Sequence, residues 1–161
     1  MNYYKVPYKS PISVAALAYA KNTNAWGKYF NFDATQLPHE FIREDALLNL
    51  LSKKYAMAVG IVRLNPYVCY DWHIDTRRGV GVNMLLTPEV RSSCLFAAGE
   101  GAQFGVEELV YEPSTFYVFN TQNKHMVLNF DQPRYLLTVE FELDKDHLSF
   151  YDLVQELKNP A

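Results

Sequence analysis

Two histidines and one aspartate have the residue types and spacing of a metal site. His73 and Asp75 lie two residues apart in a run that favours a strand, where alternate side chains point to the same side. His125 follows an aromatic segment and a polar turn, and we expect it on a neighbouring strand. Two imidazoles and one carboxylate are the ligands of many non-haem Fe(II) sites, which keep positions open for a chelating co-substrate and oxygen. Zinc also binds three protein ligands of these types, so the ligands alone leave both metals open.

An arginine on the last strand-like run adds a second chemical signal. From Arg134 onward the residues alternate, with apolar side chains at Tyr135 and at every second position after it. We expect this apolar face to pack on N-terminal helices, while Arg134, Leu136 and Thr138 face the mouth of a β-sandwich. A guanidinium group in apolar surroundings needs an anionic partner, and its fork of donors suits a carboxylate. The alternative is a salt bridge to a carboxylate of the protein itself.

Four more polar residues lie close to these signals in the sequence. Asn83 interrupts the apolar run Val80–Leu86, and a buried amide needs hydrogen-bond partners. It therefore either bridges to backbone or contacts a co-substrate or substrate. Thr138 is the nearest hydroxyl to Arg134 on the same face, so Asn83 and Thr138 are both candidate cofactor-binding residues. We interpret Arg77 and Arg78, directly after the candidate metal motif, as a solvated turn that could also face an acidic substrate.

Short strand-like runs separated by turn residues fill the chain from Met57 onward. We expect strands at Met57–Leu64, Cys69–Asp75, Val80–Leu86, Ser92–Ala97, Glu107–Tyr111, Thr115–Asn120, His125–Asn129 and Arg134–Leu143. About eight such strands predict a mainly β fold, a jelly roll of the double-stranded β-helix type. The glycines between positions 99 and 105 mark a loop that we expect to act as a lid.

Helical patterns flank the predicted strands. One has Ser10 as its cap and Pro11 in its first position, and a second runs from Pro38 to about Tyr55. We expect both to pack on one sheet of the jelly roll. With 161 residues, the chain suits a single domain. Its expected divisions are a helical cover (1–56), a jelly-roll core (57–143) and a short C-terminal helix (144–161).

The composition argues against several classes of partner. Apolar residues make up 49% of the chain, the formal net charge is −3, and no run of Lys or Arg occurs, so we expect neither nucleic acid nor an anionic membrane as partner. The apolar run Ile12–Ala20 is too short and too interrupted for a signal peptide, and we expect a cytoplasmic protein. Cys69 and Cys94 lack zinc-ligand spacing, and we expect reduced, partly buried thiols.

Several segments around the candidate metal ligands together resemble the 2-oxoglutarate/Fe(II) dioxygenase superfamily. The similar segments are Val62–Pro66, Tyr70–Asp75, Val82–Leu86, Tyr111–Pro113, Val118–Asn120, His125–Asn129 and Pro133–Tyr135. The combination is most similar to the aspartyl/asparaginyl β-hydroxylase-like branch, which includes small phage and bacterial members. The resemblance covers about Met57 to Phe141. The ordered set of segments is specific, although each segment alone is not.

The resemblance implies a ligand set and a reaction. Fe(II) would be held by His73, Asp75 and His125, with 2-oxoglutarate as co-substrate and O2 as oxidant. Arg134 would bind the distal carboxylate of 2-oxoglutarate, while the keto-acid end chelates the metal. The implied reaction is oxidative decarboxylation to succinate and CO2, coupled to hydroxylation of a substrate. Many relatives place Ser or Thr two residues after the arginine, where this chain has Leu136, so the other contacts to 2-oxoglutarate differ.

We therefore predict a 2-oxoglutarate-dependent oxygenase that hydroxylates an amino-acid side chain in a peptide, a protein or a small molecule. It would act in the cytoplasm, that of a host if the chain is of phage origin. Two alternatives stay open. One is a cupin-like metal enzyme that does not use 2-oxoglutarate, in which Arg134 anchors a substrate or is structural. The other is a non-catalytic jelly-roll binding module, in which the His-x-Asp triplet is accidental.

Overall fold

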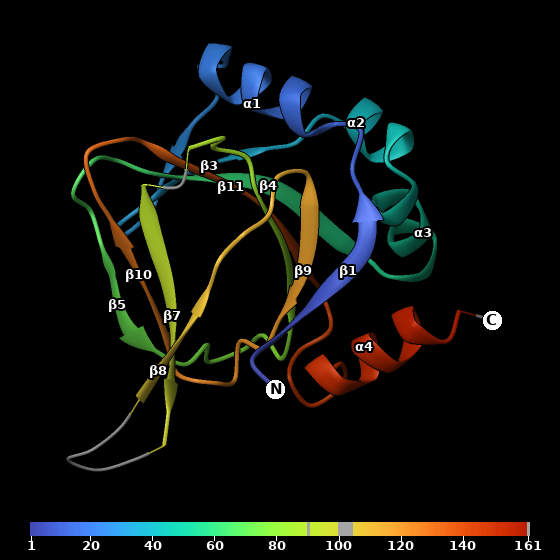
Figure 1. Cartoon of the computed structure of the whole chain (residues 1–161). Coiled ribbons are helices and arrows are strands. Elements are labelled where there is room, and N and C mark those ends of the chain that lie inside the picture. Colours follow the sequence, from blue (N-terminus) through green and yellow to red (C-terminus); the bar gives the residue numbers. More distant parts are fainter. Residues whose placement is uncertain (90, 100–104, 161) are drawn as a thin grey trace.

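A computed structural model describes residues 1–89, 91–99 and 105–160, and these residues form two facing antiparallel sheets (Figure 1). The larger sheet has the order β1 (Tyr3–Lys9), β9 (Thr115–Phe119), β6 (Gly81–Leu85), β11 (Arg134–Phe141), β4 (Met57–Leu64), β3 (Asp33–Gln36) and β2 (Gly27–Lys28). The smaller sheet has the order β5 (Tyr70–His73), β10 (His125–Asn129), β7 (Ser92–Ala98) and β8 (Gly105–Leu109). The prediction of a mainly β jelly roll is confirmed.

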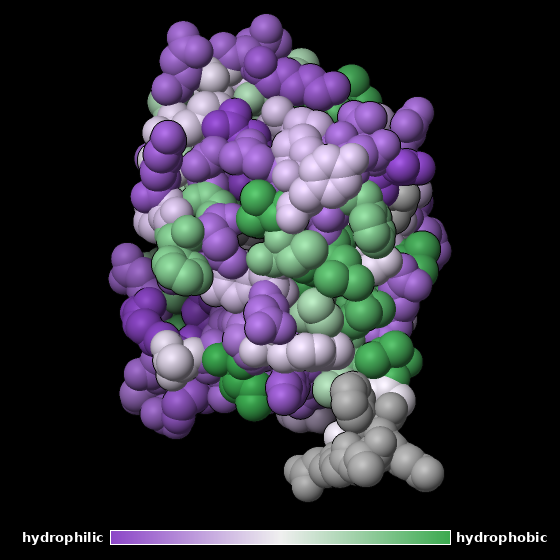
Figure 2. Space-filling model, turned by 90° about the vertical axis from the view of Figure 1, so that its left-hand side faces the viewer, coloured by the Kyte–Doolittle hydropathy of each residue, from purple (hydrophilic) through white to green (hydrophobic). Residues whose placement is uncertain are grey.

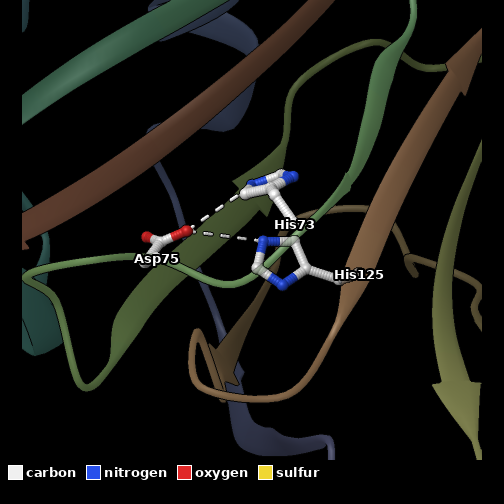
Figure 3. A group of neighbouring side chains, drawn as sticks. All are labelled: His73, Asp75 and His125. Atoms are coloured by element: carbon white, nitrogen blue, oxygen red, sulfur yellow. Dashed lines mark ion pairs between the residues drawn. The ribbon is translucent and has the colours of Figure 1, made fainter.

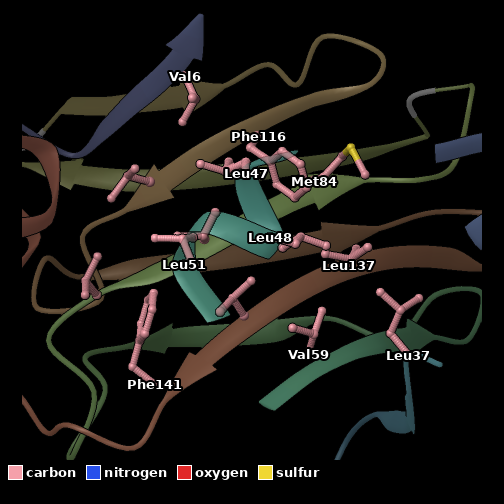
Figure 4. Packing of buried hydrophobic residues seen from close by; sticks show 14 of the residues in the cluster. Val6, Leu37, Leu47, Leu48, Leu51, Val59, Met84, Phe116, Leu137 and Phe141 are labelled. Carbon is pink, nitrogen blue, oxygen red and sulfur yellow. The ribbon is translucent and has the colours of Figure 1, made fainter. Parts of the chain in front are cut away.

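In the described part of the chain, four helices cover the side of the larger sheet that faces away from the smaller one (Figure 1). They are α1 (Ser13–Asn22), α2 (His39–Glu44), α3 (Ala46–Lys54) and α4 (Phe150–Lys158). Figure 4 shows the side chains of α3 pointing at this sheet, where Leu48 and Leu51 meet Phe116 and Leu137 in one buried cluster. Burying each such side chain contributes about 1.5–3 kcal/mol, so this layer holds the helices on the sheet.

The two faces of β11 pack against different clusters, as the alternation of its side chains predicts. Tyr135 and Leu137 belong to the cluster under the helices. Leu136 packs instead against a second cluster, which lies between the two sheets. The buried members of this second cluster are Leu85, Cys94, Phe96, Leu109, Tyr111, Tyr117 and Phe119. The inner face of β11 therefore looks into the sandwich, and Arg134 and Thr138 lie on that face.

The first fifty-six residues differ from the expectation of helices and loops, because they also contain β1, β2 and β3. β1 contains Pro7, and it is at the edge of its sheet, where a residue without an N–H is tolerated. The register of β1 against β9 also shifts between Lys5 and Lys9.

The predicted helix limits need two corrections. The helix expected from Pro38 to Tyr55 is two helices, since the extended backbone of Asp45 separates α2 from α3. Ser10 does not cap the first helix, which begins at Ser13 without a side-chain cap. The Ser10 hydroxyl donates instead to the carboxylate of Asp45 at 2.6 Å. Asp45 is fully buried and is itself the N-cap of α3.

The outer face of the smaller sheet is partly apolar. Figure 2 looks at this side of the molecule and shows hydrophobic side chains gathered among hydrophilic ones. By register, Leu95 and Met126 lie on this face, and Val106 beside them is 55% exposed. Within the described residues, no helix is long and apolar enough to cross a membrane. The predicted lid falls mostly on residues 100–104, which lie outside the described part of the chain.

Candidate metal centre

The structure brings His73, Asp75 and His125 together (Figure 3). β5 pairs with β10 so that His73 lies directly opposite His125. Asp75 follows the end of β5, whereas the sequence predicted it within the strand; its backbone N–H donates to the carbonyl of Thr121 at 3.1 Å. One candidate ligand atom from each residue lies within 4.8 Å of the other two. Oδ1 of Asp75 is 3.5 Å from Nε2 of His73 and 3.6 Å from Nε2 of His125.

Backbone carbonyls fix which nitrogen of each imidazole is available. Nδ1 of His73 lies 2.7 Å from the carbonyl oxygen of Asp71, and Nδ1 of His125 lies 2.7 Å from that of Asn123. A carbonyl only accepts, so each Nδ1 carries the hydrogen of this bond. Nε2 is then the nitrogen of each ring that lies near Asp75 and is available to a metal, as in metal sites where an outer hydrogen bond orients the imidazole. The donor atoms therefore fit a divalent metal.

The protonation states also suit a metal. Burial lowers the pKa of His125, and the nearby His73 lowers it further, so His125 is a neutral ligand near pH 7. Burial raises the pKa of Asp75, but hydrogen bonding from His73 and the positive charge of Arg78 outweigh it. The net pKa of Asp75 lies below its ordinary value. The site therefore presents one carboxylate and at least one neutral imidazole.

Arg78 orients the carboxylate of Asp75, a role that the sequence did not predict. Its Nε donates to Oδ2 of Asp75 at 2.8 Å, and its Nη2 forms an ion pair with the same oxygen at 2.7 Å, which leaves Oδ1 to face the histidines. The interpretation of Arg77 and Arg78 as a solvated turn is therefore wrong for Arg78 and right for Arg77, which is exposed and donates to the carbonyl of Glu142. The position of Arg78, three residues after Asp75 in a turn, was the available signal.

Arg134 is a buried cation without a protein carboxylate. Its side chain is 5% exposed, and its Nε donates to the hydroxyl of Ser92 on β7 at 3.1 Å, across the space between the sheets. The guanidinium carbon lies 5.9 Å from the ring centre of Tyr111. Among the ion pairs of residues 1–89, 91–99 and 105–160, none includes Arg134, although Arg63, Arg78 and Arg91 are all paired. This distribution favours an anionic ligand at Arg134, since an unpaired buried charge is costly.

The other two candidate cofactor-binding residues contact each other. Thr138 lies opposite Asn83 in the register of β11 and β6, and its hydroxyl donates to Oδ1 of Asn83 at 2.7 Å. Asn83 is buried, and both side chains lie on the inner face that carries Arg134. Arg63, outside this face, pairs with Asp33 and stacks on an indole ring, in agreement with a structural role.

The fold and the centre together define a class of protein. It is a double-stranded β-helix with two histidines and one carboxylate converging at the edge of its smaller sheet, an arrangement that could hold a single metal ion. No protein-family model matches the sequence, and no curated protein sequence matches it either.

Solved structures share this fold at low sequence identity. A prolyl-4-hydroxylase from Pseudomonas putida matches with a TM-score of 0.67 and 14% identity, over 88% of this chain and 92% of that one. A prolyl hydroxylase from Trichoplax adhaerens, in complex with a peptide of hypoxia inducible factor, matches with a TM-score of 0.67 and 14% identity, over 89% and 83% of the two chains. A viral collagen prolyl hydroxylase from Paramecium Bursaria Chlorella virus-1, in a 2-oxoglutarate complex, matches with a TM-score of 0.59 and 16% identity, over 86% of this chain and 94% of that one. The chain thus has the fold of the 2-oxoglutarate/Fe(II) oxygenases.

Proposed function

We propose that this chain is an Fe(II)- and 2-oxoglutarate-dependent oxygenase that hydroxylates an amino-acid side chain and releases succinate and CO2. The observation that carries the proposal is a conjunction. Three ligand atoms from His73, Asp75 and His125 lie within 4.8 Å of one another, and the buried Arg134 on the inner face has no carboxylate partner among the described residues. A metal site and an anion site are the two halves of a binding site for an oxo-acid.

The metal ligands are preorganised by the chain itself. Fe(II) held by Nε2 of both histidines and Oδ1 of Asp75 would supply the binding and activation of oxygen that hydroxylation requires. The carbonyls of Asp71 and Asn123 keep each imidazole in the tautomer that can ligate. The apolar rings of Phe96 and Phe119 lie against His125 and exclude water from the inner side of the centre.

Arg134 is proposed to bind the distal carboxylate of 2-oxoglutarate. Ser92 occupies Nε of Arg134, which fixes the plane of the guanidinium and leaves its two terminal nitrogens for a carboxylate. Asn83 and Thr138 are proposed to contact the same ligand from the neighbouring strands, as the sequence predicts. This assignment makes Arg134 an anchor for the co-substrate, and the cupin-like alternative would make it an anchor for a substrate.

The substrate is proposed to be an amino-acid side chain, in a peptide or protein or as a free amino acid. The similarity to a hydroxylase in complex with a peptide supports the peptide form. The structural matches named above are prolyl hydroxylases, whereas the sequence segments resemble the aspartyl/asparaginyl branch, so both kinds of side chain belong in the first screen. We also propose that the protein acts in the cytoplasm.

Two anaerobic titrations test the proposal. Fe(II) is expected to bind the wild-type protein at one ion per chain, and His125→Ala is expected to abolish tight binding because one ligand of three is lost. In metal-loaded protein, Arg134→Ala is expected to keep the metal but weaken 2-oxoglutarate by about 2–5 kcal/mol. Arg134→Lys should also be impaired, because a point charge cannot form the two-point contact.

Product analysis then separates the alternatives. Succinate formed with a peptide or amino acid that gains one oxygen atom supports the proposed reaction. Iron binding without any affinity for 2-oxoglutarate would favour the cupin-like enzyme. An absence of iron binding in the wild-type protein would favour the non-catalytic binding module and overturn the proposal.

A further inference from the structure

The turn between β9 and β10 contacts two of the three candidate ligands through its backbone. The carbonyl oxygen of Asn123 lies 2.7 Å from Nδ1 of His125, and the carbonyl of Thr121 accepts from the backbone N–H of Asp75 at 3.1 Å. Both contacts are made by main-chain atoms of the turn, so whatever fixes the backbone of this turn also fixes these two ligands. Outer contacts of this kind orient metal ligands and tune their affinity.

Residues 1 and 2 hold both ends of this turn. β1 begins beside the end of β9, so the residues before β1 lie along the turn (Figure 1). The backbone N–H of Asn120 donates to the carbonyl of Asn2 at 2.9 Å. The carbonyl of Met1 accepts from the side-chain amide of Asn120 at 3.1 Å and from that of Asn123 at 3.3 Å. The turn is thus tied to a segment that lies 119 residues earlier in the chain.

A contact between two amide side chains completes this arrangement. Nδ2 of Asn123 also donates to Oδ1 of Asn2 at 2.7 Å. The carbonyl of Met1 can only accept, so the atom that Asn123 turns toward it is the amide nitrogen, and Asn2 presents its oxygen to the same nitrogen. Each hydrogen of the Asn123 side-chain amide then has an acceptor. These two bonds hold the side chain of Asn123, and with it the carbonyl that faces His125.

The other neighbours of His125 cannot replace this carbonyl. The rings of Phe96 and Phe119 pack against the imidazole and limit its movement, but an apolar ring does not distinguish the two ring nitrogens. The Asn123 carbonyl does distinguish them, because it binds Nδ1 and leaves Nε2 to face Asp75.

We propose that Asn2 and Asn123 are positioning residues for the metal centre, and that their contact fixes the carbonyl that makes Nε2 of His125 the ligand atom. This inference rests on the metal half of the proposed function and adds two residues that neither the resemblance nor the sequence pattern assigned. A change at position 2, outside the jelly-roll core expected from the sequence, should therefore reach the metal.

Three variants test the contact itself. Asn123→Ala removes the amide that holds the turn, and Asn2→Ala removes one acceptor of that amide. Asn2→Asp keeps an acceptor at the same place and should behave like the wild-type protein. Because the side chain of Asn2 is only half-buried, both Asn2 variants are expected to fold.

Asn129 provides a matched control on the same strand. It is buried, and its side-chain amide donates to three backbone carbonyls at the end of β10 remote from His125. Asn129→Ala should therefore lower the thermal stability at least as much as Asn123→Ala but leave the metal affinity unchanged. It separates a general loosening of β10 from a loss of ligand orientation.

The first measurement needs no metal. Heteronuclear NMR of the histidine rings at pH 8 should show the proton of His125 on Nδ1 in the wild-type, Asn2→Asp and Asn129→Ala proteins. Asn123→Ala should show a mixture of the two tautomers. The second measurement is calorimetric titration with Mn(II), a stand-in for Fe(II) that does not turn over. Asn123→Ala is expected to weaken Mn(II) binding about tenfold or more, and Asn2→Ala about fivefold, the usual effect of losing one hydrogen bond.

The other outcomes overturn the inference. Wild-type Mn(II) affinity in Asn2→Ala and Asn123→Ala would mean that the contact serves the fold alone. A loss in Asn129→Ala equal to that in Asn123→Ala, or a loss in Asn2→Asp equal to that in Asn2→Ala, would lead to the same conclusion. In each of these cases the wild-type protein still binds Mn(II), and the proposed function stands. If the wild-type protein does not bind Mn(II), the proposed function and this inference both fail.

Discussion

Asp75 uses its two carboxylate oxygens differently. Oδ2 accepts a hydrogen bond from Nε of Arg78 and forms an ion pair with its Nη2, while Oδ1 faces Nε2 of His73 and of His125. The carboxylate is therefore oriented before a metal arrives, and the positive charge of Arg78 favours its ionised form. Outer contacts of this kind set the geometry of metal ligands and tune their affinity.

Arg78→Ala is expected to weaken Mn(II) binding by about 10- to 100-fold, the usual effect of losing an outer partner of a ligand. Without Arg78, its positive charge and its hydrogen bond no longer lower the pKa of Asp75, so that pKa rises and metal binding should be lost at a higher pH than in the wild-type protein as the pH falls. Titrations at several pH values measure both effects. Arg77→Ala is the control, because the Arg77 side chain is exposed and pairs with Glu140 and the carbonyl of Glu142 rather than with Asp75. Equal losses in both variants would contradict a specific role for Arg78.

The two cysteines should differ in reactivity. Burial raises the pKa of Cys94 to about 11, and this outweighs the opposite effect of Arg134. Cys69 is exposed rather than partly buried as the sequence predicted. At pH 8 a chromogenic thiol reagent should titrate one cysteine quickly in the folded protein and both in denaturant. Cys69→Ser should abolish the fast reaction, and a fast reaction that persists in this variant would contradict the assignment.

Strand positions could be predicted where one strand face is buried. Met57–Leu64 and His125–Asn129 have the predicted limits, because alternating burial produces a local pattern that the sequence shows. The pairing of Arg78 with Asp75 and the approach of Tyr111 to Arg134 depend on turn geometry and on the packing of distant strands. The short spacing of Arg78 and Asp75 allows their pairing without requiring it, and no local pattern encodes the approach of Tyr111 to Arg134. The grouping of His73, Asp75 and His125 could be predicted because the His-x-Asp triplet and the later histidine occur together with Arg134 in an ordered set of segments that resembles a known superfamily.

Helices α3 and α4 both begin with a side-chain N-cap, one buried and one exposed. They allow a test of how burial changes the contribution of an N-cap to stability. Asp45 is fully buried, accepts from the backbone N–H of Leu48 at 2.9 Å and accepts from the hydroxyl of Ser10. Ser149 caps α4 through an exposed capping box with Asp152.

Ser149→Ala is expected to lower the free energy of unfolding by about 1 kcal/mol. Asp45→Ala should lower it by more, about 2–4 kcal/mol, because the buried Ser10 hydroxyl also loses its partner. Urea unfolding followed by circular dichroism measures both. Equal losses would mean that Ser10 finds another acceptor when Asp45 is removed.

The loop that carries Asp75 is held by parts of the chain that are far apart in sequence. The side-chain amide of Gln122, in the turn between β9 and β10, donates to the carbonyls of Asp75 and Arg78 at 2.8 and 2.7 Å. On the other side, the backbone N–H of Lys145, beyond β11, donates to the carbonyl of Arg77 at 2.8 Å. The metal centre therefore depends on the packing of the C-terminal segment as well as on its own strands.

Gly79 lies against the C-terminal segment, and Gly79→Ala should damage the fold and the candidate metal site together. A Cβ at this position would collide with the carbonyl oxygen of Leu148 and lie 2.9 Å from Cα of Lys145, so backbone would have to move. We expect a loss of about 1–3 kcal/mol of stability, the usual cost of overpacking, and weaker Mn(II) binding because the loop carries Asp75. Gly81→Ala is the control, since its added Cβ would meet no heavy atom closer than 3.8 Å. Thermal unfolding and Mn(II) titration of both variants provide the comparison. If Gly79→Ala lost stability but kept wild-type metal affinity, the C-terminal segment would support the fold without positioning Asp75.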